Sequence, residues 1–361
     1  MKPYLCTCGN TLYFENSRCL ECQRKVAYDC VGDRMVEISA DGHYALCANG
    51  VTYQSCNWAV PAASAGALCP SCVLTQVIPD LTLSKNRFLW NRMEQAKRHA
   101  IYSLMRLELT VIDRRRDPEG GLAFNFLSST PEERVLTGHE NGVITLDLDE
   151  ADDAIRETNR TRFHEPYRTL LGHFRHEIGH YYWHLWFEVN ASPAILSACR
   201  EVFGDERADY AEAMKKHYAE GAPAGWEKAF ISPYSTMHPW EDWAETWAHY
   251  LHICDVLESA KAFGLEQGLK RKEIDLYTPE DARLPAPWRD LDPTPFLVLL
   301  HRWIRLSPAL NAIARSLGHE NLYPFVLSTP VVKKLHVIHA CIESPPAPLE
   351  ESPVPIADPA K

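Results

Sequence analysis

The sequence predicts an α+β protein in which a small cysteine-rich domain precedes a mostly helical domain with a small sheet. Nine of the 12 cysteines fall within the first 72 residues, where short strand-like runs alternate with turn residues and helical periodicity is weak. Beyond this region, apolar residues recur mainly at helical spacing. We therefore expect domains over 1–75 and 76–343, and a disordered Pro-rich tail over 344–361.

The composition is that of an ordinary globular protein, with 361 residues of which 46% are hydrophobic and 24% are charged. The N-terminus has no apolar leader, and no stretch approaches the roughly 18 apolar residues of a membrane span. We therefore expect a cytoplasmic protein without membrane contact. The formal net charge of −11 argues against a nucleic-acid-coating protein, because phosphate binding requires a cationic surface.

A first cysteine quartet is formed by two short chelating loops, Cys-x-Cys and Cys-x-x-Cys. Its members are Cys6, Cys8, Cys19 and Cys22. Clustered thiols in a reducing cytosol are more typical of metal sites than of disulfides. Since four thiolates leave zinc no open position, we expect a structural zinc site without chemistry of its own.

A second possible quartet has only one closely spaced pair, because the first two of its cysteines are nine residues apart. Its members are Cys47, Cys56, Cys69 and Cys72. Both a second structural zinc site and four simply buried thiols remain open. The cysteines without any pairing logic are expected to be small core residues: Cys30, Cys199, Cys254 and Cys341.

The second domain is expected to open with an amphipathic helix over 83–107. Strands are predicted over 122–127 and 143–148, the second launched from the turn-rich run 138–142. The acidic run 149–153 suits a helix N-terminus. Further helices are expected from Pro166 to His184 and over 193–203, 205–220, 240–263, 294–316 and 330–342.

Basic residues gather between Lys85 and Arg116, where nine cations face three acidic residues for a net charge of +6. We expect a solvated helix face followed by a basic turn. A docking site for an acidic partner remains the alternative.

The run His176-Glu177-Ile178-Gly179-His180 is the most informative motif in the chain. On a helix the two histidines lie one turn apart on the same face, so both imidazoles can bind one metal ion. Zinc lowers the pKa of a bound water to about 7, and Glu177 is placed to act as the general base on that water. His173 and His184 share this face, either as polar lining residues or as further ligands.

Two features around this motif point to a working site. The predicted strand 143–148 precedes the motif's helix, and its free edge would hold an extended peptide above the metal. Gly179 costs about 1 kcal/mol inside a helix, which suggests that another group passes close to the backbone there.

A third zinc ligand is expected in the helix that Pro239 begins, because a catalytic zinc usually has three protein ligands. Glu241 in its first turn would bind the metal, and Glu245 one turn later would accept a hydrogen bond from a ligand imidazole. Tyr234 would stabilise the oxyanion. An exposed acidic first turn is the structural alternative, and the rival ligand is Asp205 or Glu206.

These residues together resemble the bacterial zinc-ribbon-containing zinc metallopeptidases. Besides the first quartet, the matching stretches are 56–58, 69–75, 78–81, 91–98, 137–142, 173–183, 203–206 and 240–245. The resemblance implies a zincin-like catalytic domain behind a zinc ribbon. Glu241 with Glu245 is also similar to the third-ligand helix of the gluzincins, and Tyr234 to the catalytic tyrosine of lethal-factor-like peptidases.

The sequence therefore predicts a zinc metallopeptidase of the HExxH type that cleaves proteins or peptides. Its metals would be one catalytic zinc and one or two structural zinc ions. The alternative is a non-catalytic interaction or nucleic-acid-binding protein, in which the zinc of the HExxH motif is structural.

Overall fold

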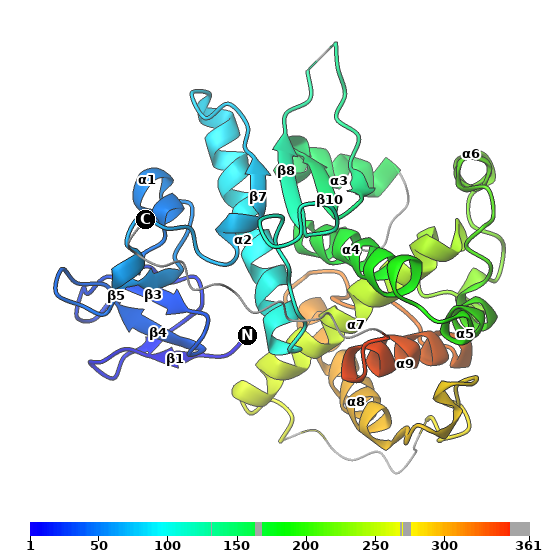
Figure 1. The fold of residues 1–361 in the computed structure, drawn as a ribbon. Coiled ribbons are helices and arrows are strands. Elements are labelled where there is room, and N and C mark those ends of the chain that lie inside the picture. The colour runs from blue at the N-terminus through cyan, green and yellow to red at the C-terminus, as the bar shows by residue number, and fades with distance from the viewer. Residues whose placement is uncertain (131, 163–167, 268, 270–275, 347–361) are drawn as a thin grey trace.

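The computed structural model describes residues 1–130, 132–162, 168–267, 269 and 276–346. A cysteine-rich lobe and a helical lobe lie on opposite sides of a long helix, α2 (Ser84–Arg106) (Figure 1). One hydrophobic core joins them, since Trp58, Trp90 and Trp243 belong to the same buried cluster. The predicted α+β class is confirmed. The tail expected over 344–361 lies outside the described residues from 347 onward.

The cysteine-rich lobe contains three two-stranded antiparallel sheets and a short helix, α1 (Ala48–Tyr53). Phe14, Tyr28 and Trp58 pack edge to face between them, with ring centroids 4.8 and 5.3 Å apart. Sheets this small bury little apolar surface, so the lobe depends on these rings and on its thiol clusters. The strand pairs are β1 (Tyr4–Leu5) with β2 (Thr11–Leu12), β3 (Val26–Asp29) with β4 (Arg34–Glu37), and β5 (Tyr44–Leu46) with β6 (Ala59–Pro61).

A four-stranded sheet lies beside α2 in the order β7-β8-β10-β9. The expectation that strand 143–148 has a free edge is wrong, because β10 lies between two partners and β9 is outermost. The cause is a tight turn at Asn141 and Gly142, whose φ angles of 46° and 83° fold β9 back onto β10. The strands are β7 (Thr75–Val77), β8 (Ala123–Leu127), β9 (Gly138–Glu140) and β10 (Val143–Asp147).

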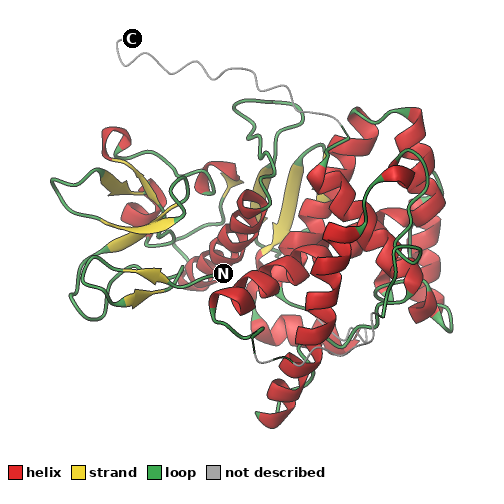
Figure 2. Ribbon diagram, turned by 90° about the horizontal axis from the view of Figure 1, so that it is seen from below, coloured by secondary structure: helices red, strands yellow, loops and turns green. Residues whose placement is uncertain are grey.

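The helical lobe is built around α4 (Leu170–Trp183) and α7 (Pro239–Ala262), which pack against each other. Figure 2 shows the helices gathered on one side of the molecule and the short strands of the cysteine-rich lobe on the other. The remaining helices are α3 (Asp153–Arg162), α5 (Pro193–Phe203), α6 (Tyr210–Glu220), α8 (Thr294–Ser316) and α9 (Thr329–Glu343). The helices predicted over 83–107, 193–203, 240–263, 294–316 and 330–342 match α2, α5, α7, α8 and α9 to within two residues.

Three helix boundaries differ from expectation for local reasons. The helix predicted over 205–220 begins only at Tyr210, because the Asp209 side chain caps it by accepting a hydrogen bond from Glu212 N. Most of the acidic run at 149–153 forms a 3₁₀ turn, η3 (Leu148–Ala151), before α3. Pro166 lies outside the described residues, and α4 begins after Thr169, which caps it. A π-helical turn, η4 (His184–Val189), follows α4.

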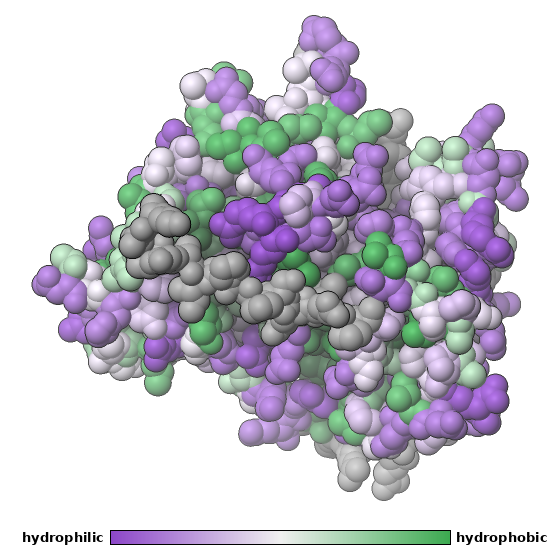
Figure 3. Space-filling model, in the orientation of Figure 1, coloured by the Kyte–Doolittle hydropathy of each residue, from purple (hydrophilic) through white to green (hydrophobic). Residues whose placement is uncertain are grey.

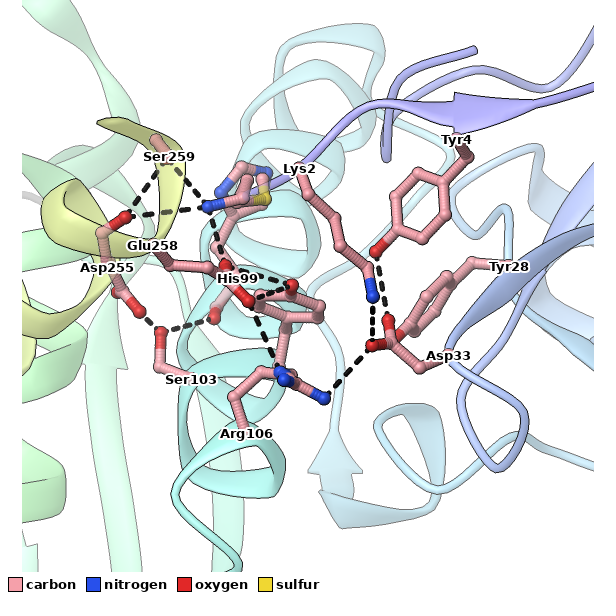
Figure 4. A network of polar contacts seen from close by, with 12 residues as sticks. Lys2, Tyr4, Tyr28, Asp33, His99, Ser103, Arg106, Asp255, Glu258 and Ser259 are labelled. Atoms are coloured by element: carbon pink, nitrogen blue, oxygen red, sulfur yellow. Dashed lines mark hydrogen bonds and ion pairs between the residues drawn. The ribbon is translucent and has the colours of Figure 1, made fainter. Parts of the chain in front are cut away.

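A network of polar contacts ties the cysteine-rich lobe to the helical lobe through α2 (Figure 4). Arg106 of α2 reaches Asp33 in the turn between β3 and β4 at 3.0 Å, and Glu258 of α7 at 3.2 Å. Further along, Asp255 of α7 receives a 2.5 Å contact from Arg175 of α4. The chain of contacts thus runs from the cysteine-rich lobe to the helix that carries the HExxH motif.

The basic segment 85–116 carries much of its charge on α2, and acidic residues of the chain neutralise several of its cations. The docking of an acidic partner therefore finds no support here. The ion pairs are Lys85–Asp149, Arg92–Asp153, Lys97–Glu94, Arg106–Asp33 and Arg115–Asp113.

Hydrophilic residues cover most of the face seen in Figure 3, with hydrophobic residues interspersed. Several large apolar side chains are exposed, including Val31, Leu136 and Phe88. Among the described residues, no helix combines the length and apolar character that crossing a bilayer requires.

Candidate metal centre

The first cysteine quartet lies toward the surface of the cysteine-rich lobe, where Cys8 is exposed. Its four Sγ atoms lie within 4.8 Å of one another. The Sγ atoms of Cys6 and Cys22 are 3.7 Å apart, as are those of Cys8 and Cys19. Zinc bound tetrahedrally at about 2.3 Å requires sulfur separations of about 3.8 Å. The spacing therefore fits one zinc ion.

The second quartet is entirely buried, although the sequence left its metal site open. Its members are Cys47, Cys56, Cys69 and Cys72, and their Sγ atoms lie within 4.8 Å of one another. The Cys56 and Cys69 sulfurs are 3.7 Å apart, and Cys69 N donates a hydrogen bond to the Cys47 sulfur at 3.2 Å. Four simply buried thiols need no common centre, so this convergence favours a metal ion.

Helix α2 supplies buried charges beside the second quartet. Arg98 donates to the carbonyl of Ser55, the residue before Cys56, and is 5% exposed. Glu94 and Lys97 form a fully buried ion pair of 2.9 Å. A four-thiolate zinc site carries a net charge of −2, so a buried guanidinium nearby offsets part of the cost of burying it.

The HExxH motif lies on α4, as its pattern predicts, and faces the first turn of α7. The Nε2 atoms of His176 and His180 are 3.2 Å apart. Glu241 Oε2 lies 2.9 Å from the first and 3.5 Å from the second. Tetrahedral zinc with bonds of about 2.05 Å requires donor separations of about 3.3 Å, so these three residues fit a zinc ion.

Glu245, one turn beyond Glu241 on α7, contacts the other nitrogen of His176. His176 Nδ1 donates to Glu245 Oε1 at 2.8 Å, and Ser232 Oγ donates to Glu245 Oε2 at 2.6 Å. Burial alone would lower the pKa of His176, but the contacts with Glu241 and Glu245 raise it well above its usual value. A metal on Nε2 would take the place of the proton that faces Glu241, while Glu245 keeps the proton on Nδ1.

Two buried carboxylate oxygens show whether the residues of this site fit a bound metal ion. Among the described residues, neither Glu177 Oε2 nor Glu241 Oε2 accepts a hydrogen bond, although His176 Nε2 lies 2.9 Å from the second oxygen. Leaving such an oxygen buried and unsatisfied is costly. Both costs disappear if a metal binds Glu241 and a water lies beside Glu177, so the residues present fit a metal-dependent site.

Tyr210 is a member of the site that the sequence did not predict. Its hydroxyl, at the start of α6, donates to Glu241 Oε1 at 2.8 Å. It therefore fixes the carboxylate so that Oε2 faces the histidines. The motif gives no signal for it, because Tyr210 lies 31 residues before Glu241 in a different helix.

Tyr234, in the 3₁₀ turn η6 (Tyr234–Thr236), lies beside the site, with its ring 5.9 Å from the ring of His176. Burial, followed by the nearby charge of Glu241, raises the pKa of Tyr234 well above its usual value. Its hydroxyl therefore keeps its proton at neutral pH and remains a hydrogen-bond donor.

The other residues considered as ligands lie elsewhere. Asp205 is paired with Arg207 at 2.6 Å, and Glu206 with Arg200 at 2.5 Å. His184 Nδ1 contacts Glu188 at 2.7 Å. Within the described part of the chain, the group that converges on the two HExxH histidines contains only Glu241.

Close packing sets the distance between the two helices that hold the site. A Cβ atom on Gly179 would lie 3.0 Å from Ala244 Cα, and Trp243 Nε1 donates to the Gly179 carbonyl at 2.8 Å. The group expected to pass close to Gly179 is thus the backbone of α7. Next to Glu241, the buried Asp242 is paired with Lys334 of α9 at 2.6 Å, which anchors the first turn of α7.

Comparison with known proteins identifies both lobes. Residues 86–341 match a family described as "Putative zinc-binding metallo-peptidase", and residues 3–83 match a zinc-ribbon domain. Uncharacterized proteins of Mycobacterium bovis and Mycobacterium tuberculosis are 45% identical over 344 residues, which cover 95% of this chain and 96% of each relative. No solved structure matches the chain. The family and the two cysteine clusters together support zinc binding.

Proposed function

Because the chain belongs to the metallo-peptidase family so described, we propose that it is a zinc-dependent peptidase that hydrolyses peptide bonds of proteins or peptides. One observation carries the proposal. Three donors converge from α4 and α7, and a buried glutamate with an unsatisfied oxygen lies beside them. Three protein donors leave one position of a tetrahedral zinc open, as in catalytic sites.

In this proposal His176, His180 and Glu241 hold the catalytic zinc. The ion would supply Lewis acidity toward a substrate carbonyl and make water a nucleophile near neutral pH. Glu177 takes the proton of the attacking water and later returns it to the leaving amine. Its carboxylate is ionised and so able to do so: burial tends to raise its pKa, but His173, followed by His176 and His180, keeps the pKa below its usual value.

Tyr234 and Tyr210 divide the remaining work. Tyr234 donates its hydroxyl hydrogen to the oxyanion that develops on the substrate carbonyl. Tyr210 and Glu245 hold the ligands in place, the first through Glu241 and the second through His176.

Substrate would bind along β9, the outer strand of the four-stranded sheet. His139 of β9 lies 5.9 Å from the ring of His184 and 6.3 Å from that of Tyr181, so the strand runs beside α4. The outer edge of such a strand presents backbone groups that pair with an extended peptide. A peptide added there would pass the HExxH helix.

The expected division at residue 75 and the cytoplasmic location belong to the same proposal. β7 begins at Thr75 and pairs with β8 of the helical lobe, which supports a division near residue 75. A reducing compartment keeps the eight quartet thiols available as ligands. The non-catalytic alternative relied on the positive charge of the segment 85–116. Five cations of this segment form ion pairs within the chain, so this charge does not favour that alternative.

Replacing the general base tests the proposal. Glu177→Gln should lower the rate of cleavage of denatured casein by about 100- to 10,000-fold, because the amide cannot accept the proton. Zinc content, measured by atomic absorption, should stay at three ions per chain. Glu280→Gln, at an exposed glutamate, is the matched control and should cleave like the wild type. Undiminished cleavage by purified Glu177→Gln would overturn the proposal.

A further inference from the structure

We infer that His173 is a positioning residue, held between Glu150 and Glu177, that selects the carboxylate oxygen of Glu177 that receives the proton. This inference rests on the proposed function. Its basis is a chain of contacts that lies outside the group of metal-binding donors.

His173 precedes the HExxH motif by one turn of α4, and each of its ring nitrogens faces a carboxylate. Nε2 lies 3.2 Å from Glu177 Oε1, and Nδ1 lies 3.4 Å from Glu150 Oε2. Glu150 comes from η3, directly after β10. It is itself held by Arg168, whose Nη2 is 3.4 Å from the same oxygen. The side chains of Glu150, His173 and Glu177 are 15%, 20% and 7% exposed.

The number of donors on the ring decides its charge. A neutral imidazole has one N–H group and can donate to only one carboxylate, whereas an imidazolium donates to both. Burial by itself would lower the pKa of His173, but the charge of Glu150 and the hydrogen bonds with both glutamates raise it to about 9. Because a carboxylate oxygen lies within 3.4 Å of each ring nitrogen, an imidazolium at His173 would complete a carboxylate–imidazolium–carboxylate chain of ion pairs.

The contact with His173 makes the two carboxylate oxygens of Glu177 inequivalent. Oε1 lies 3.2 Å from His173 Nε2 in an ion-pair contact, and Oε2 is buried without a donor among the described residues. With the first oxygen fixed, rotation about the terminal bond of the side chain is restricted and Oε2 is the oxygen left to accept a proton. Fixing a general base in this way avoids searching through unproductive orientations in each turnover.

Glu150 supplies what an isolated imidazolium would lack. A positive charge buried next to Glu177 would make the base much weaker, since an opposite charge favours the ionised carboxylate. The second carboxylate shares that positive charge and stabilises the ring from its far side. Glu150 thus lets His173 orient the base with less loss of its basicity.

Kinetics of four variants test the inference on a quenched fluorescent peptide that the wild type cleaves. His173→Leu should lower kcat by about 10- to 100-fold, with KM and zinc content unchanged, because it removes only the support of the base. His173→Gln keeps one N–H donor and should recover part of the loss. In a Glu177→Gln background, His173→Leu should cause no further loss. The exposed His319→Leu is the control and should match the wild type.

Nuclear magnetic resonance gives a readout that does not require activity. In the zinc-loaded protein, the imidazole ¹⁵N signals that vanish in His173→Leu belong to His173. At pH 7 they should show protons on both nitrogens, and Glu150→Gln should return the ring to one proton.

The outcomes separate the inference from the proposed function. If the wild type cleaves nothing but His173 is doubly protonated, the peptidase proposal fails and the contact chain stands. A singly protonated His173 in the wild type overturns the inference, and so does an equal loss from His173→Leu with and without Glu177. Loss of zinc in His173→Leu would also overturn it, because His173 would then support the metal rather than the base.

Discussion

Each cysteine quartet offers four donors of one kind from short loops, whereas the histidine site offers three donors of two kinds from two long helices. The loops contain little regular secondary structure, so we expect a bound ion to stabilise their shape. Helices α4 and α7 are instead held by aromatic packing, as between Trp183 and Trp243, whose ring centroids are 5.5 Å apart. This difference leads us to expect that metal supports the fold in one region and, under the proposed function, the chemistry in the other.

Breaking the second quartet should give the largest effect. Cys69→Ser should lose one zinc ion and lower the free energy of unfolding by about 5 kcal/mol or more, because structural zinc contributes folding energy directly. Thermal unfolding followed by circular dichroism, together with zinc content, measures both losses. Cys30→Ser, in the same lobe but outside both quartets, should retain every ion. A normal unfolding temperature for Cys69→Ser would contradict the comparison.

Removing the Glu241 ligand from the histidine site should lower the free energy of unfolding by a smaller amount. Glu241→Gln should reduce zinc from three ions to two per chain and leave the helical fold intact. At a zinc concentration 1,000 times the Kd, the lost binding lowers the free energy of unfolding by about 4 kcal/mol. Calorimetry with and without added zinc separates this loss from damage to the fold, since apo wild type and apo variant should then unfold alike. If the apo variant is much less stable than the apo wild type, the helices depend on more than their packing.

The smallest effect should be a pH dependence around His173. The pKa of His173 is raised to about 9, so its contribution to stability is fully present below its unfolded pKa of about 6.5 and is lost as pH rises through 9. The pKa of Glu150 is lowered to about 2 despite burial, so its share is present above about pH 4.3. Urea unfolding of wild type and His173→Leu should therefore differ on the order of 2 kcal/mol between these limits and converge above pH 9. A constant difference would assign the loss to packing alone.

The parts of the site that could be predicted from the sequence are those that one helix determines by itself. Helical periodicity places His176 and His180 on one face, and Pro239 at a helix start places Glu241 and Glu245 one turn apart. The metal-binding group needs only that these two helices meet. Gly179 indicated from the sequence only that some group passes close to its backbone, and the structure shows that this group is the backbone of α7.

The residues that escaped prediction reach the site from elements remote in sequence. Tyr210, Glu150 and Lys334 contact Glu241, His173 and Asp242 from α6, η3 and α9, and no spacing rule connects them. The outer strand β9 was missed because Gly-His-Glu shows no alternation of apolar and polar residues. Only tertiary structure shows that it displaces β10 from the edge of the sheet.

The close contact at Gly179 also limits the size of the metal ion that the donors on the two helices can bind. The missing side chain lets α7 approach α4 until a methyl group would meet the Ala244 backbone at 3.0 Å, and the donor separations of 2.9 to 3.5 Å follow from that approach. Replacing Gly179 with alanine would push the two helices apart, because the backbone of α7 cannot rotate out of the way as a flexible side chain can. The two helices would move apart by a few tenths of an ångström. The separations between the donor atoms on α4 and α7 would then increase, from values that fit the short bonds of zinc toward values that fit a larger cation.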